Sequence, residues 1–290
     1  MWKDLILLIR PRQLIKQGVI LLPAFFAGRL FEPNAWWRLL IAWVCFGMVA
    51  GAVYILNDLY DQEADRLHPT KRFRPIASGR VSSWVALVSL GLLILISIPC
   101  AWLLDHEASY WMMAYLLINV GYSRYLKHVP IVDLMVIGSG FLIRLAVGSE
   151  VLEPIVPLSK WILVLVFLGA LFLGLAKRRD DVLLGQQGGY TRSSVEGYTL
   201  PLVDTGLGIL AAVILVVYLG YTLSPEVEAR MQSQQVWTTS LFVLFGLFRY
   251  LHSAFVRQST GNPVQVITSD IWLQMAILGW MAMYGWFLYG

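Results

Sequence analysis

Long apolar stretches, separated by short polar segments, occupy most of the chain. Nine of them are candidates for membrane-spanning helices: residues 14–31, 36–56, 83–104, 109–125, 131–149, 158–176, 203–223, 236–256 and 270–289. A spanning helix needs about 20 predominantly apolar residues. The stretches are continuous and rich in leucine, whereas the strands of a membrane barrel alternate in hydrophobicity. The pattern therefore predicts an all-α integral membrane protein built as a bundle of nine transmembrane helices.

The composition supports a membrane protein and excludes an ordinary soluble enzyme. Of the 290 residues, 58% are hydrophobic and 14% are charged, whereas a soluble domain carries about 25% charged residues. The two cysteines, Cys45 and Cys100, lie inside apolar stretches. Two thiols are too few for a disulfide framework, and buried packing is their expected role.

The distribution of basic residues gives the expected orientation in the membrane. Of the 22 lysines and arginines, 17 fall on the side of the N-terminus and four on the opposite side. Because basic residues concentrate in cytoplasmic loops, the N-terminus is expected in the cytoplasm and the C-terminus outside. We expect one polytopic domain over residues 1–290 in the inner (cytoplasmic) membrane. Its long cytoplasmic loops, about residues 57–82 and 177–202, would cap an active site.

An acidic motif ends the second apolar stretch. Residues 57–65 read N-D-L-Y-D-Q-E-A-D, so the polar positions are Asn57, Asp58, Asp61 and Asp65. If the helix continues, these four side chains share a face about 100° wide. Carboxylates on one face repel one another unless positive charge offsets them, and hard oxygen ligands suit Mg²⁺. The four residues are therefore the expected metal ligands, with a solvated helix end paired to neighbouring arginines as the alternative.

A basic segment follows the acidic motif directly. It carries Lys71, Arg72 and Arg74 between two prolines. Arginine and lysine side chains are the usual phosphate ligands, although membrane anchoring alone would also explain them. Cations beside a carboxylate stripe favour a ligand that carries both phosphate and metal. The expected ligand is a phosphate ester or diphosphate bound as its Mg²⁺ complex.

A second charged cluster ends the sixth apolar stretch. It consists of Lys177, Arg178, Arg179, Asp180 and Asp181. The two acids lie 100° apart on a helix, and we favour Asp181 for the site because it shares a face with Lys177. The glycine-rich residues 185–192 that follow contain no P-loop pattern. They are expected to form either a loop that closes over a ligand or a plain surface loop.

Other basic residues extend the candidate set. Arg124 and Lys127 lie between the fourth and fifth apolar stretches, near the same face. Arg144 lies inside the fifth stretch, and an ionisable residue within a span is a functional candidate by default. Structural pairing of Arg144 with Asp133 or with a backbone carbonyl is equally open.

The acidic motif in this membrane setting resembles the UbiA superfamily of intramembrane prenyltransferases. That resemblance implies nine helices and two acidic cytoplasmic motifs. The first family motif, N-D-x-x-D-x-x-x-D, is matched in full by residues 57–65. The second, usually D-x-x-x-D, is not matched by residues 177–181, which read K-R-R-D-D. The departure argues against ordinary prenyl transfer to an aromatic ring.

A closer similarity within the superfamily is to the decaprenyl-phosphate phosphoribosyltransferases, over nearly the whole chain. The similar stretches are residues 10–16, 57–65, 68–77, 126–130, 177–178 and 249–251. This resemblance implies that 5-phosphoribosyl 1-diphosphate binds with Mg²⁺ and that a polyprenyl phosphate is the acceptor. The product would be a lipid-linked phosphoribose, a precursor of pentoses for cell-envelope polysaccharide.

The resemblance and the residue chemistry together give the expected roles. Asp58, Asp61 and Asp65, with Asn57 assisting, would hold Mg²⁺, and Asp181 would act as an orienter or metal ligand. The residues expected to bind donor phosphates are Lys71, Arg72, Arg74, Arg124, Lys127, Lys177 and Arg178. Arg12 and Lys16 would bind the acceptor's phosphate. No nucleic acid partner is expected, and a homo-oligomer is left open.

Two other functions remain as alternatives. One is a prenyltransferase that moves a prenyl group from a prenyl diphosphate to a small aromatic or isoprenoid acceptor. The other is a transporter or lipid-binding protein. Polar residues gather at one face and, Arg144 apart, are scarce at mid-membrane, which argues against transport.

Overall fold

The fold is described by a computed structural model of residues 2–186, 197–256 and 263–289, without the side chains of Trp2, Arg12 and residues 263–265. These residues form helices and turns and contain no strand, which confirms the predicted all-α class. The chain divides into two compact units, Met1–Leu158 and Ser159–Gly290. Each unit is described by itself, and the single domain expected over residues 1–290 stays a prediction.

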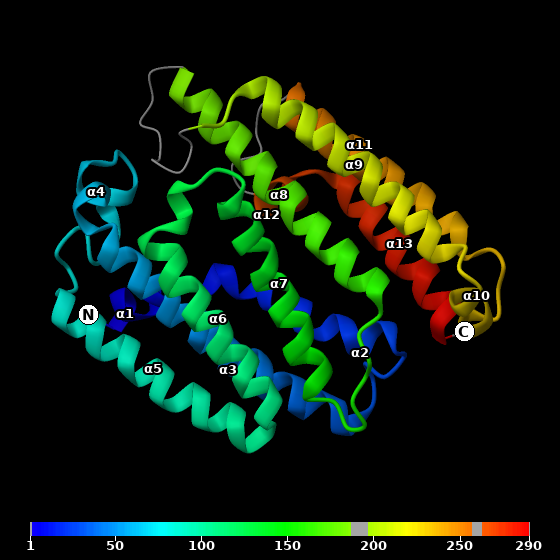
Figure 1. Cartoon of the computed structure of the whole chain (residues 1–290), viewed down its shortest axis with the longest axis horizontal. Helices are drawn as coiled ribbons and strands as arrows, with labels where there is room; N and C mark the ends of the chain where they lie inside the picture. The colour runs from blue at the N-terminus through cyan, green and yellow to red at the C-terminus, as the bar shows by residue number, and fades with distance from the viewer. Residues whose placement is uncertain (1, 187–196, 257–262, 290) are drawn as a thin grey trace. The chain divides into compact units, whose positions relative to one another are not determined.

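Unit 1 is built around one central helix, α3. Its elements are α1 (Trp2–Ile9), η1 (Pro11–Leu21), α2 (Leu22–Phe26), α3 (Pro33–Tyr60), α4 (Gln62–Leu67), η2 (Lys71–Phe73), α5 (Ser83–Leu104), α6 (His106–Arg124), η3 (Leu126–His128) and α7 (Val132–Glu150). Helix α3 packs against α5 and α6, and α6 packs against α7 (Figure 1). Leu39, Phe46 and Val49 of α3 are fully buried and join Met112 and Val147 in one core. The apolar composition of α3 on all sides follows from this central position.

Unit 2 consists of long helices linked by short ones. Its elements are α8 (Lys160–Gln186), α9 (Leu200–Thr222), α10 (Pro225–Met231), η5 (Val236–Thr239), α11 (Ser240–Phe255), α12 (Pro263–Ser269) and α13 (Ile271–Tyr289). Helix α8 packs against α9, and α11 packs against α13. The Tyr218 hydroxyl lies 2.7 Å from the Thr239 hydroxyl and accepts a hydrogen bond from Trp280 Nε1 (2.6 Å). These bonds join α9, η5 and α13.

Six helices of the described residues are long and apolar enough to cross a membrane: α3, α5, α7, α8, α9 and α13. The predicted count of nine is therefore not confirmed. Residues 14–31 are divided between η1 and α2, because Lys16, Gln17 and Pro23 interrupt the apolar run. Helix α6 covers the fourth predicted span but is less apolar, and α11 covers the eighth with 16 residues.

The two expected cytoplasmic loops contain more helix than predicted. Residues 57–82 include the end of α3, all of α4 and η2. Helix α8 continues to Gln186, so residues 177–186 are helical rather than loop. Lysine, arginine and aspartate lower the hydropathy of residues 177–181 without breaking a helix. The glycine-rich segment, which disfavours a helix, begins only at Gly185. Residues 187–196, which include most of the predicted glycine-rich loop, lie outside the described residues.

Gly148 of α7 gives a testable measure of how closely η1 packs. A Cβ atom added at Gly148 would overlap the Ile20 carbonyl oxygen and lie 2.9 Å from its carbonyl carbon. Because backbone atoms cannot rotate away, we expect Gly148→Ala to destabilise the protein by about 3 kcal/mol. The unfolding midpoint of purified protein in detergent measures this loss.

Gly91→Ala in α5 is the matched control. A Cβ atom at Gly91 would meet no heavy atom within 4 Å. Alanine is a better helix former than glycine, so this variant should be as stable as the wild type or slightly more stable. Equal unfolding midpoints for the two variants would contradict the close approach of η1 to α7.

Candidate active site

The acidic motif lies where α3 passes into α4. Asn57 and Asp58 belong to the last turn of α3, Asp61 lies between the helices, and Asp65 belongs to α4. The helix does not run straight through, but its hydrogen-bond spacing is kept. The Asp61 amide donates to the Asn57 carbonyl (2.9 Å), and the Asp65 amide donates to the Asp61 carbonyl (2.8 Å). This spacing leaves Asp58 and Asp65 on a common side.

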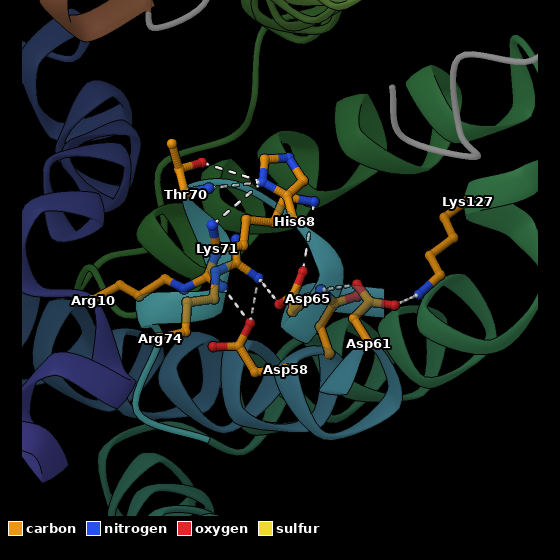
Figure 2. Close-up of polar contacts among 10 residues, drawn as sticks. Arg10, Asp58, Asp61, Asp65, His68, Thr70, Lys71, Arg74 and Lys127 are labelled. Atoms are coloured by element: carbon orange, nitrogen blue, oxygen red, sulfur yellow. Dashed lines mark hydrogen bonds and ion pairs between the residues drawn. The ribbon is translucent and has the colours of Figure 1, made fainter. Parts of the chain in front are cut away.

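Arg74 joins two of the three aspartates. Its Nη1 donates to Asp58 Oδ1 (2.9 Å) and to Asp65 Oδ2 (2.6 Å). Both aspartates are buried, with side chains only 4% and 3% exposed. Lys71 Nζ lies 3.6 Å from the other oxygen of Asp65. The two predicted motifs, acidic and basic, therefore meet in one cluster (Figure 2).

The loop that carries these cations is folded by His68. The His68 Nδ1 atom accepts hydrogen bonds from the backbone amides of Thr70 (3.2 Å) and Lys71 (3.3 Å). The Arg74 amide then donates to the Lys71 carbonyl (2.9 Å), closing the turn of η2. These local bonds direct Lys71 and Arg74 back toward the aspartates.

Asp61 has a separate environment within the same cluster. Asn57 Nδ2 donates to Asp61 Oδ2 (3.0 Å), and the Lys127 ammonium of η3 pairs with Asp61 Oδ1. Figure 2 shows Lys127 approaching Asp61 from the side opposite Arg10 and Arg74. Lys127, predicted from the sequence to bind donor phosphates, is thus part of the cluster.

Arg10 is a member of the cluster that sequence reasoning missed. Its Nη2 pairs with Asp58 Oδ1, and its guanidinium lies 5.1 Å from the centre of the Tyr54 ring. The residues predicted as phosphate ligands in the same stretch were Arg12 and Lys16. The available signal was Pro11, because a helix ends at or before the residue preceding a proline. A cation placed at that break is free to turn toward another element.

The cluster balances three carboxylates against four cations: Arg10, Lys71, Arg74 and Lys127. In the part of the chain that the structure describes, no three His, Cys, Asp or Glu side chains are arranged to hold a metal ion. The donor chemistry nevertheless fits Mg²⁺. One Arg74 nitrogen contacts both Asp58 and Asp65, so these two carboxylates are close enough to share one positively charged partner. Mg²⁺ typically uses one or two protein carboxylates together with substrate phosphates and water.

Several other predicted residues lie apart from the aspartates. Arg72 and Arg124 are exposed and stack on Phe73 (4.9 Å) and Tyr125 (5.0 Å). The structure therefore does not bring these two arginines into the cluster. Lys16 is exposed, and the Arg12 side chain lies outside the described atoms.

The second charged cluster belongs to unit 2. Arg178 is buried and lies 3.4 Å from Asp181, whereas Asp180 is the more buried of the two acids. Arg179 donates to Asp204 (2.7 Å) and to the Ala254 carbonyl (2.6 Å), which ties α8 to α9 and α11. Lys177 is half-buried. The preference for Asp181 stays a prediction.

Comparison with known proteins decides the family. A profile of the UbiA prenyltransferase family matches residues 19–186, more than half of the chain. The chain belongs to the UbiA prenyltransferase family. UbiA proteins are integral membrane proteins, and the predicted transferase class is confirmed by the relatives.

Two UbiA relatives match nearly the whole chain. The decaprenyl-phosphate phosphoribosyltransferase of Mycolicibacterium smegmatis is 31% identical over 97% of this chain and 91% of that protein. The protein of the same name from Mycobacterium tuberculosis is also 31% identical, over 96% of this chain and 91% of its own.

A solved structure confirms the UbiA fold. The UbiA homolog from Archaeoglobus fulgidus bound to DMAPP and Mg²⁺ superposes with a TM-score of 0.70. It covers 98% of this chain and 99% of its own, at 16% sequence identity. At that identity the likeness establishes the fold alone.

Proposed function

We propose that this UbiA protein transfers 5-phosphoribose from 5-phosphoribosyl 1-diphosphate to a polyprenyl phosphate and releases diphosphate. The observation that carries the proposal is the cluster of three aspartates surrounded by four cations. A donor with a diphosphate and a further phosphate needs several cations, whereas a prenyl diphosphate needs fewer. The full-length similarity to proteins named decaprenyl-phosphate phosphoribosyltransferase supports the same donor and acceptor.

Asp58, Asp61 and Asp65, with Asn57, would hold the Mg²⁺ that the reaction needs. When bound, the metal would supply positive charge that stabilises the leaving diphosphate. A UbiA homolog solved with DMAPP and Mg²⁺ supports divalent metal use in this fold. Arg10, Lys71, Arg74 and Lys127, which surround these aspartates, would bind the donor phosphates.

The acceptor needs orientation more than activation. A lipid phosphate is already anionic near neutral pH, so its oxygen can attack the anomeric carbon without a strong general base. Arg12 and Lys16 would orient that phosphate at the membrane surface. The donor-binding roles expected for Arg72, Arg124, Lys177 and Arg178, and the role of Asp181, remain predictions.

The proposed topology places the reaction on the cytoplasmic face. Counted over the nine predicted spans, the bias of 17 basic residues against four supports an N-terminus in the cytoplasm and a C-terminus outside. The aspartate cluster then faces the compartment that contains a soluble phosphorylated sugar. The product would serve lipid-linked pentose synthesis for the cell envelope.

Purified protein, incubated with Mg²⁺, polyprenyl phosphate and ribose-labelled phosphoribosyl diphosphate, tests this function. We expect label in the extracted lipid, and EDTA should lower the rate at least about a hundredfold because the metal charge is lost. No labelled lipid, together with transfer from a prenyl diphosphate, would establish the prenyltransferase alternative. If neither product forms, the result would favour the transporter or lipid-binding alternative.

A further inference from the structure

Three cations of unit 1 lie on or against η1: Arg10, Lys16 and Arg144. Arg10 stands at the start of η1, Lys16 lies within it, and Arg144 of α7 donates a hydrogen bond to Gln17, the residue after Lys16. Arg10 is paired with Asp58. Neither Lys16 nor Arg144 has a carboxylate partner anywhere in residues 2–186, 197–256 or 263–289. This corner of unit 1 therefore carries positive charge that the described chain does not balance.

Arg144 is buried in the interior of unit 1, at 4% exposure. Its guanidinium donates to Gln17 Oε1 (2.7 Å), to the Gly140 carbonyl (2.6 Å) and to the Tyr115 hydroxyl (3.3 Å). The carbonyl bond is one of the structural pairings considered from the sequence. All three partners are neutral, and the remaining contacts are aromatic rings of Phe46, Tyr115 and Phe141 at 4.7, 5.0 and 5.2 Å. A charge inside a span without a counter-charge is costly, which makes it a functional candidate.

Gln17 supplies an independent observation at the same place. Its side chain is fully buried, and Oε1 accepts from Arg144 while Nε2 has no hydrogen-bond partner within the described chain. A buried donor without an acceptor is rare and costs stability. An anion beside Arg144 would satisfy this donor and balance the guanidinium at once. Lys16, the residue before Gln17, is exposed and would bring a second positive charge to such an anion.

We propose that Lys16, Gln17 and Arg144 form a binding site for a phosphate monoester, next to but separate from the aspartate cluster. Arg10 links the two, because it pairs with Asp58 and begins the η1 segment that carries Lys16 and Gln17. The inference rests on the proposed function, which brings two such groups to the protein: the phosphate of the polyprenyl acceptor and the 5-phosphate of the donor. Both offer the same oxygens to an ammonium, an amide and a guanidinium.

Binding of inorganic phosphate to the full chain in EDTA tests the site. Without metal, the cations of the aspartate cluster stay paired with their carboxylates. By calorimetry, Arg144→Gln should weaken phosphate binding at least about tenfold, the effect of one lost charge-assisted hydrogen bond. Lys16→Gln, a change at an exposed side chain, should weaken it several-fold even if Arg144→Gln fails to fold.

Arg38→Gln is the matched control, because Arg38 is also a buried arginine of unit 1. It donates to the Val151 and Leu104 carbonyls and pairs with Glu153 (2.9 Å). Phosphate affinity should therefore be unchanged in this variant. Wild-type affinity in Lys16→Gln and in folded Arg144→Gln, or equal losses in all three variants, would overturn the proposal.

Competition identifies the source of the phosphate. Displacement of bound phosphate by a short-chain isoprenyl phosphate assigns the site to the acceptor, and displacement by ribose 5-phosphate assigns it to the donor. Displacement by neither would overturn the link to the substrates. Since phosphate binding needs no turnover, absence of phosphoribosyl transfer would refute the proposed function without altering this result.

Discussion

Replacing Asp61 by asparagine is expected to lower kcat/KM for transfer by about a hundredfold or more while the protein still folds. Asp61 is a proposed metal ligand, and asparagine keeps its shape but removes its charge. The side chain is 27% exposed, so folding does not depend on it as on a buried carboxylate. The transfer assay, run beside a measurement of the unfolding midpoint, checks both halves of this expectation.

Glu63→Gln is the control for Asp61→Asn. It removes the same charge two residues away, from an exposed side chain of α4. Its activity should stay within about twofold of the wild type, because exposed substitutions away from a site have small effects. Near-wild-type activity in Asp61→Asn would refute the metal role. Equal losses of activity in both variants would indicate a general effect of negative charge rather than a metal-ligand role for Asp61.

Replacing Arg74 by glutamine is expected to impair stability and activity together. Arg74 bridges Asp58 and Asp65, whose side chains are only 4% and 3% exposed. Removing one partner of a buried ion pair costs about 3 kcal/mol or more. The loss in free energy of unfolding should lie near the lower end, about 3 kcal/mol, because Arg10 remains beside Asp58 and Lys71 beside Asp65. Transfer should fall at least tenfold as a phosphate ligand is lost.

Arg72→Gln provides the stability control for Arg74→Gln. Arg72 is exposed and stacks on Phe73, so its loss should change the free energy of unfolding by less than about 0.5 kcal/mol. Denaturant unfolding of the two variants in detergent gives the comparison. Equal stability of both would contradict the bridging role of Arg74.

The parts of the site that lie close in sequence could be predicted from it. The acidic motif and the basic segment are separated by a short loop, and local hydrogen bonds of His68 and Asp61 bring Lys71 and Arg74 to the aspartates. Helical spacing therefore gave the correct side for Asp58 and Asp65. The condition set for a shared face, a helix that continues straight, is not met at Asp61, where α3 ends.

The parts that depend on tertiary packing could not be predicted. Arg10 meets Asp58 across 48 residues, and no periodicity relates the two. Gln17 and Arg144 are 127 residues apart, so their hydrogen bond is visible only once η1 packs on α7. The prediction from hydropathy that a loop begins at about residue 177 was also wrong, because the charged last turns of α8 are helical although they are not apolar.

The fate of each donor phosphate tests the central proposal most directly. Phosphoribosyl diphosphate labelled with ³²P in the 5-phosphate, or separately in the terminal diphosphate position, is incubated with protein, Mg²⁺ and polyprenyl phosphate. We predict that the 5-phosphate label moves into the lipid while the terminal label remains in water as diphosphate. Lipid labelled from the terminal position, or no labelled lipid from folded protein, would contradict phosphoribosyl transfer.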